Sequence, residues 1–225
     1  MNEFVDNMRD QIMDLNNSQP FLKEVSASDS CVVIRGKYVV HAEMNGEPFS
    51  DSFMLEITID DKFPRTVPKV KELEKRITPY NYNDHIYQDQ ILCLEVDTRM
   101  IIELDGNPTL SFFSERFVFP YLLGFLYYQK HGIFPFDDYS HGKAGLLEYY
   151  CAIFDVDDKY KAKQLLGLIL KNHFPSHNNC PCESGKLYKD CHYNQVNRLR
   201  DSKFIERYVI DYYKVSRWSI FQKQS

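Results

Sequence analysis

Three cysteines and one histidine lie close together near the end of the chain, in the run CPCESGKLYKDCH. Three thiolates and one imidazole are a usual donor set for structural zinc, which prefers four ligands in a tetrahedron. Pro181 stiffens the first cysteine pair, and Gly185 allows the tight return that brings the remaining donors to the same ion. We therefore predict a structural Zn2+ site with the ligands Cys180, Cys182, Cys191 and His192. Because the protein fills all four positions, none is left open for a catalytic water.

This run, from Cys180 to His192, resembles the SEC-C motif. The motif is a small zinc-binding tail found at the end of the SecA preprotein translocase and on many unrelated bacterial proteins. The resemblance implies that the C-terminal part of the chain docks onto another protein and does not itself catalyse a reaction.

A further cysteine, Cys93, stands alone in the run ILCLEV. By default, a cysteine between two leucines is a small buried core residue. The preceding stretch KFPRTVPKV is interrupted by Pro64 and Pro68, and the family resemblance that this stretch carries, given next, implies a nucleophilic thiol instead. Cys31 and Cys151 lie in apolar runs without such context, so we expect both in the core.

Phe63-Pro64, Val67-Pro68 and Leu92-Cys93-Leu94 resemble the core of the ubiquitin-conjugating (UBC) enzymes. In that family, a Tyr-Pro-x-x-Pro-Pro-x-Val run precedes a catalytic cysteine. The resemblance implies an α+β, UBC-like domain built from an N-terminal helix, an antiparallel meander and later helices. It also implies a cysteine acyltransferase. Cys93 would carry the C-terminus of a protein as a thioester and pass it to an amine on a target protein.

Three later runs are similar to bacterial UBC-like proteins of antiphage defence islands: FPYL at 119–122, GIFP at 132–135 and SHGKAG at 140–145. This likeness implies a role in CBASS-type antiviral signalling. The transferred partner would be a ubiquitin-like protein or a CD-NTase-type nucleotidyltransferase, and the acceptor another protein. His141, in the last run, becomes a candidate for the catalytic site.

The chain departs from the UBC family ten residues before the cysteine, where the family has a His-Pro-Asn tripeptide. Asn83-Asp84-His85 stands there, with His85 at the position of the Asn that assists the oxyanion. An imidazole N–H can donate to an oxyanion, so His85 is a candidate for that role. The sequence leaves open whether Asp84, Asp89 or Asp97 helps to deprotonate the amine. The altered tripeptide also keeps two alternatives open, an inactive UBC-fold binding module and a zinc-dependent adaptor.

The order of the expected elements agrees with an α+β domain. Apolar residues at helical spacing predict a helix over 4–15, and β-branched runs on either side of Asn45-Gly46 predict a hairpin. Two helices are expected near 117–128 and 145–154, and a further amphipathic helix over 194–218. The cysteine cluster and a change from acidic to weakly basic composition place the domain boundary between residues 171 and 172. We thus expect a UBC-like domain over 1–171 and a zinc motif with a C-terminal helix over 172–225.

Composition excludes several classes of protein. The chain has 225 residues and a net charge of −5, which argues against a nucleic-acid binder held by phosphate contacts. The longest nearly apolar run, 117–128, is too short for a membrane span of about 20 residues. The first residues carry acidic side chains and do not form a signal peptide. We therefore expect a cytoplasmic protein without a membrane partner, whose thiols stay reduced.

Overall fold

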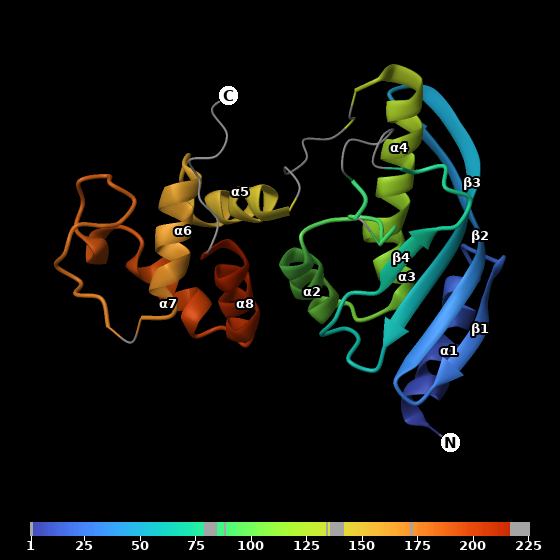
Figure 1. The fold of residues 1–225 in the computed structure, drawn as a ribbon, viewed down its shortest axis with the longest axis horizontal. Coiled ribbons are helices and arrows are strands. Elements are labelled where there is room, and N and C mark those ends of the chain that lie inside the picture. The colour runs from blue at the N-terminus through green and yellow to red at the C-terminus, as the bar shows by residue number, and fades with distance from the viewer. Residues whose placement is uncertain are drawn as a thin grey trace. The chain divides into compact units, whose positions relative to one another are not determined.

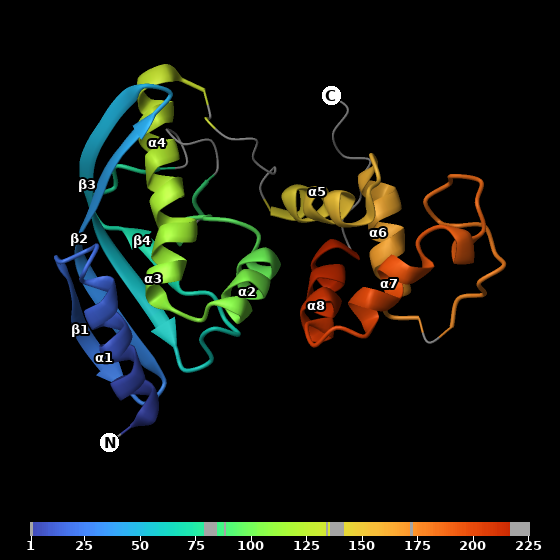
Figure 2. The ribbon, with the colours of Figure 1, turned by 180° about the vertical axis from the view of Figure 1, so that it is seen from behind.

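A computed structural model describes residues 2–78, 85–87, 89–133, 135, 142–171 and 173–216. The chain forms two compact units, Met1–Asp138 and Tyr139–Ser225. Figures 1 and 2 show a sheet with helices in the first unit, whereas the described residues of the second form helices joined by turns and loops. The expected α+β class is confirmed.

The sheet of the first unit has four antiparallel strands in chain order. They are β1 (Leu22–Ser28), β2 (Cys31–Met44), β3 (Glu47–Asp60) and β4 (Lys69–Glu72). Asn45 and Gly46 connect β2 to β3, both with positive φ, as a two-residue hairpin turn requires. The predicted hairpin is therefore present, and its long strands form the centre of the sheet.

One face of this sheet is buried. Alternate residues of β2 and β3 are inaccessible to solvent, among them Ile34, Tyr38, Phe53 and Leu55. Helix α1 (Glu3–Leu15) and helix α4 (Phe119–His131) pack against that face (Figures 1 and 2). The arrangement follows from the period of two in the strands, which sends every second side chain toward the helices.

Helix α4 is preceded by a helix and two short helical segments. Helix α2 (Asp97–Gly106) is followed by α3 (Leu110–Phe113) and by one π-helical turn, η1 (Ser114–Val118). The buried hydroxyl of Tyr38 lies 2.7 Å from Oγ of Ser114, which ties the π-helical turn to β2. The helix expected near 117–128 thus begins in η1 and continues as α4.

The second unit contains α5 (Gly142–Phe154), α6 (Lys159–Leu168), a 3-10 turn η2 (Tyr188–Asp190), α7 (Tyr193–Arg200) and α8 (Ile205–Ser216). Two contacts join its early and late parts. The buried hydroxyl of Tyr150 in α5 donates to Oδ2 of Asp211 in α8 at 2.9 Å. Gly167 in α6 lies so near the ring of Tyr212 that a Cβ there would come within 2.9 Å of it.

This division of the chain differs from the boundary between residues 171 and 172 that the sequence favoured. Helices α5 and α6 belong to the same compact unit as the cysteine cluster, because their side chains pack against α7 and α8. The single helix expected over 194–218 is two helices, interrupted after Arg200. Within the described ranges, no helix is long and apolar enough to cross a membrane.

Candidate functional site

Cys93 lies on a short two-stranded segment next to the sheet. Its N–H donates to the carbonyl oxygen of His85 at 2.9 Å, and the N–H of Tyr87 donates to that of Ile91 at 2.8 Å. Gln90 closes the turn between the two strands with a φ of 67°. This register sets His85 directly opposite Cys93 and Tyr87 opposite Ile91, so Tyr87 lies diagonally across from Cys93.

The segment is fastened to the core on both sides of the turn. Ile86 and Leu92 form an antiparallel bridge, and both side chains are buried. The N–H of Leu92 also donates to the carbonyl oxygen of Val70 in β4 at 2.8 Å. The core residues next to Cys93 therefore fix its position, as a reactive group requires.

Cys93 is half-buried, and its sulfur is close to a phenol. Its thiol donates to the hydroxyl oxygen of Tyr87 at 3.3 Å. The side chain of Tyr87 is 46% exposed, so this pair lies where the segment meets solvent. Desolvation of the hydroxyl and the nearby Cys93 sulfur raise the pKa of Tyr87 above its ordinary value, so the phenol keeps its proton also in the alkaline range where a free tyrosine would begin to lose it.

His85 is buried, with only 4% of its surface exposed. Its carbonyl oxygen accepts two hydrogen bonds, one from the Cys93 N–H and one from the hydroxyl of Tyr121 at 2.6 Å. The imidazole and the Tyr121 ring meet edge to face, with centroids 6.4 Å apart. The structure thus brings His85 to Cys93 through the backbone.

Of the remaining candidates, Asp89 lies in the turn before Ile91 and Asp97 is the first residue of α2. The others lie outside the described residues. They are His141 and the first two members of the altered tripeptide, Asn83 and Asp84. The sequence reasoning missed Tyr87 and Tyr121. A signal for Tyr87 existed, because it stands two positions after His85 in a segment that forms a strand.

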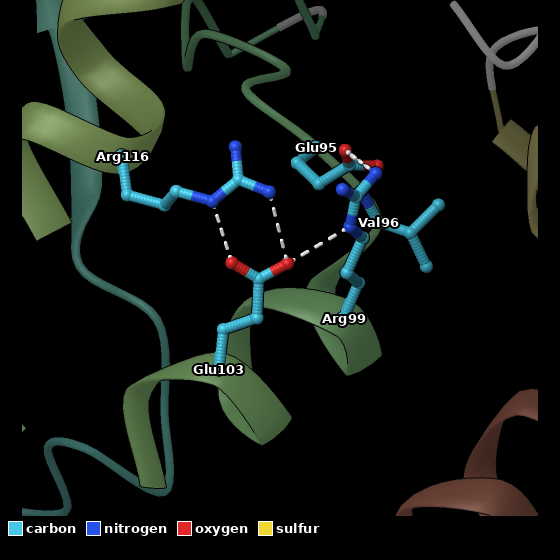
Figure 3. A network of polar contacts seen from close by, with 5 residues as sticks. All are labelled: Glu95, Val96, Arg99, Glu103 and Arg116. Atoms are coloured by element: carbon cyan, nitrogen blue, oxygen red, sulfur yellow. Dashed lines mark hydrogen bonds and ion pairs between the residues drawn. The ribbon is translucent and has the colours of Figure 1, made fainter. Parts of the chain in front are cut away.

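A network of charged side chains follows Cys93 directly (Figure 3). Glu95 accepts from Nη1 of Arg99 at 2.7 Å, and Nε of Arg99 donates to Glu103 at 3.0 Å. Glu103 also accepts from Nε of Arg116 at 2.7 Å. The network connects the segment after the thiol to α2 and η1. Because Arg99 compensates its charge, Glu95 does not act on Cys93 as an isolated anion.

In the second unit, the structure brings the four predicted metal ligands together. The donor atoms of Cys180, Cys182, Cys191 and His192 all lie within 4.8 Å of one another. Nδ1 of His192 is 3.2 Å from the sulfur of Cys180 and 3.1 Å from that of Cys191. Zinc–sulfur bonds of roughly 2.3 Å in a tetrahedron place sulfur atoms about 3.8 Å apart. The donor set and its spacing are therefore compatible with a bound metal such as zinc.

Local backbone structure explains this convergence. The N–H of Cys180 donates to the carbonyl oxygen of Lys186 at 2.9 Å, and Asn179 pairs with Leu187 in an antiparallel bridge. Gly185 takes a φ of 76° in the turn between them. The first two cysteines thus sit on a small hairpin, and the last two ligands follow where η2 ends and α7 begins.

Neighbouring groups hold the ligands in place. Nε2 of His192 lies 2.8 Å from the carbonyl oxygen of Phe154, which leaves Nδ1 available for the metal. Oγ of Ser184 lies 3.2 Å from the sulfur of Cys182 and 3.4 Å from that of Cys191. Burial raises the pKa of Cys180 to about 12. Burial alone would also raise the pKa of Cys182, but hydrogen bonding with Ser184 outweighs it and lowers that pKa to about 6.

An open groove of about 710 Å³ runs beside the cluster. Phe154, Cys182 and Cys191 contribute to its lining, and exposed acidic side chains, including Asp155 and Asp190, lie around it. The two remaining cysteines, Cys31 and Cys151, were expected in the core. In the structure both are half-buried.

A comparison with models of protein families matches the SEC-C motif over residues 178–194. A search of the curated proteins found no match, and neither did a search of the solved structures. The assignment of a SEC-C motif to the second unit is therefore supported by the sequence match and by the Cys/His cluster in the structure. The likeness of the first unit to the UBC enzymes remains a prediction from the sequence.

Proposed function

We propose that this chain is a cysteine acyltransferase of the UBC kind. Cys93 carries the C-terminus of a protein as a thioester and passes it to an amine on a target protein. The observation that carries the proposal is the position of the Cys93 sulfur. Cys93 as a residue is half-buried, and its sulfur lies beside the hydroxyl of Tyr87, on a segment that core residues fix to the sheet. A thiol sealed in the core could not meet another protein's terminus.

Two steps of acyl transfer make up the reaction. In the first, the Cys93 thiolate attacks a thioester on a donor, and a new carbon–sulfur bond replaces the old one. In the second, the amine attacks the carbonyl carbon and the Cys93 sulfur leaves. Fixed backbone and side-chain donors near Cys93 have the task of stabilising the negative charge that develops in each step.

The order of elements supports a UBC-like first unit. An N-terminal helix, a four-stranded antiparallel meander, the cysteine segment and later helices follow one another as the resemblance implies. We further propose that the protein acts in the cytoplasm, because none of its six cysteines, all within the described residues, is in a disulfide and a transferring cysteine must stay reduced.

We assign the second unit to partner recruitment, with structural zinc as its cofactor. Cys180, Cys182, Cys191 and His192 would hold the metal. When bound, it would cross-link the hairpin to the start of α7. The open groove beside the cluster offers a surface for a protein partner. The transferred protein is a ubiquitin-like protein or a CD-NTase-type nucleotidyltransferase, and the setting is CBASS-type antiviral signalling. These identities follow from the resemblance alone.

Electrophoresis with and without reductant tests the proposal. The chain is incubated with a candidate donor protein and, in a parallel sample, with its activating enzyme and ATP. An adduct that reductant removes, that Cys93→Ala abolishes and that Cys93→Ser converts into a reductant-stable ester supports the transferase. An adduct that persists in Cys93→Ala would refute the role of this cysteine.

The burial of His85 favours a second candidate, a binding module of the same fold without transfer activity. Its imidazole is buried and packs against the ring of Tyr121. At the corresponding sequence position, the UBC family has a polar oxyanion donor. In that case the wild type and the Cys93→Ala variant bind the partner with equal affinity, and no adduct forms with any donor. Calorimetry of the wild type and the variant distinguishes the two candidates.

A further inference from the structure

We propose that Tyr87 is a catalytic residue, whose phenol donates a hydrogen bond to the Cys93 sulfur when that sulfur carries negative charge. The inference rests on the proposed transferase function and adds a role that the sequence reasoning did not assign. It concerns the leaving group of the second step, whereas His85 was a candidate for the oxyanion.

The geometry of the pair is fixed by the backbone. The hydrogen bond between the Tyr87 N–H and Ile91 and the one between the Cys93 N–H and His85 set the two strands in register. This register places the hydroxyl oxygen of Tyr87 3.3 Å from the sulfur of Cys93. That separation is typical of a hydrogen bond that involves sulfur. The contact therefore does not depend on a long side chain reaching across open solvent.

The direction of this hydrogen bond changes with the charge of the sulfur. In the neutral pair the thiol donates to the phenol oxygen. Once the sulfur is an anion it can only accept, so the phenol O–H must donate. Desolvation, the Cys93 sulfur, Asp97 and Asp89 all raise the pKa of Tyr87, and the phenol therefore keeps the proton that it needs for this task.

The transfer step shows where such a donor acts. The amine nitrogen forms a bond to the carbonyl carbon of the thioester, and the carbon–sulfur bond breaks. The electron pair of that bond stays on the Cys93 sulfur, where the Tyr87 hydrogen bond stabilises it. The proton lost by the amine passes to solvent, and the sulfur takes one back to regenerate the thiol. The products are an amide and the starting enzyme.

Tyr87 is also suited to a clean substitution. The residue is 46% exposed, whereas Ile86 and Leu92 supply the buried contacts that hold the segment. Tyr87→Phe removes the hydroxyl and leaves the backbone hydrogen bonds in place. Tyr160→Phe in α6 is a matched control, because Tyr160 is exposed to the same extent, 46%.

The first measurement needs no partner protein. Iodoacetamide alkylation of Cys93 is followed across pH by peptide mass spectrometry of the full chain, with Tyr87→Phe and Tyr160→Phe beside the wild type. A hydrogen bond to a charged group contributes about 1.5 kcal/mol or more, which is roughly tenfold in the thiol–thiolate equilibrium. We expect the midpoint of the rate profile to move to higher pH in Tyr87→Phe alone. An unchanged profile in Tyr87→Phe overturns the inference.

The second measurement separates this inference from the proposed function. A synthetic peptide with a C-terminal thioester is offered to the chain, and release of the acyl group to free lysine is timed by intact-protein mass spectrometry. Release that is several-fold slower in Tyr87→Phe than in Tyr160→Phe supports the inference. Equal release rates in these two variants overturn it. If the wild type does not load at all while Tyr87→Phe still shifts the alkylation profile, the transferase proposal fails and Tyr87 remains a partner of the thiolate.

Discussion

Nε2 of His192 lies 2.8 Å from the carbonyl oxygen of Phe154, the last residue of α5. A predicted metal ligand of the SEC-C motif is thereby oriented by a helix far away in the sequence. The hydrogen bond fixes which imidazole nitrogen faces the other ligands. The motif is consequently one part of a larger folded unit that includes α5.

This relationship predicts that the motif needs α5 for full metal affinity. A fragment over residues 172–225 lacks Phe154, and a fragment over 139–225 retains it. Loss of such an outer hydrogen bond typically costs about ten- to a hundredfold in metal affinity. Competition with a chromogenic zinc chelator should show this difference. Equal affinities of the two fragments would show that the Phe154 contact has no role in metal binding.

The full chain should bind about one zinc ion, and Cys191→Ala should lose it, because three ligands form a much weaker site. Elemental analysis of the purified chain measures the metal content. Cys151→Ala, which removes a thiol outside the cluster, should keep the ion. Metal retained by Cys191→Ala, or two ions per wild-type chain, would contradict the ligand set.

Gly167→Ala should destabilise the second unit. The added methyl group would come within 2.9 Å of the Tyr212 ring, and overpacking of this kind typically costs about 1–3 kcal/mol. Thermal unfolding followed by circular dichroism measures the loss. Gly106→Ala serves as the control, since nothing lies within 4 Å of a methyl group there. A smaller residue in place of Tyr212 should restore stability to Gly167→Ala, and failure of that rescue would contradict the packing assigned to this pair.

Glu103→Gln should weaken the network between α2 and η1 in a pH-dependent way. Burial opposes ionisation of Glu103, but hydrogen bonds from Arg116 and Arg99 prevail and hold its pKa below the ordinary 4.5. The wild-type carboxylate therefore contributes stability above the unfolded-state pKa, and this contribution is lost as pH falls through the lower folded-state value.

We expect a loss of roughly 0.5–1 kcal/mol at pH 7, because the network is partly exposed. Urea unfolding at pH 7 and at pH 3 should show a smaller difference between wild type and Glu103→Gln at pH 3 than at pH 7. A difference of equal size at both values would mean that the charge of Glu103 is not responsible.

Local patterns in the sequence predict those elements whose residues lie close together along the chain. The Asn45-Gly46 turn marks the central hairpin, and apolar spacing marks α1. The run from Cys180 to His192 contains its own ligands, hairpin and turn, so the cluster can be predicted from this run alone.

Long-range contacts explain what the sequence did not predict. The hydrogen bond between Tyr150 and Asp211 joins α5 to α8, and no local pattern indicates it. The π-helical turn at Ser114 likewise accompanies a contact with Tyr38 in a distant strand. Tyr87 is a local case instead, because it is only six residues from Cys93; its place two positions after His85 was a signal, and the turn at Gln90 folds it back toward the thiol.

Trapping the acyl intermediate in the host cell is the most direct test of the role of Cys93. The Cys93→Ser chain is expressed there, purified under denaturing conditions and digested for tandem mass spectrometry, with Cys93→Ala as the control. The account predicts a branched peptide in which the C-terminal carboxyl group of another protein forms an ester at position 93. If position 93 is found only unmodified, while iodoacetamide readily alkylates Cys93 of the wild type, the sulfur is accessible but carries no protein, and the transferase account is contradicted.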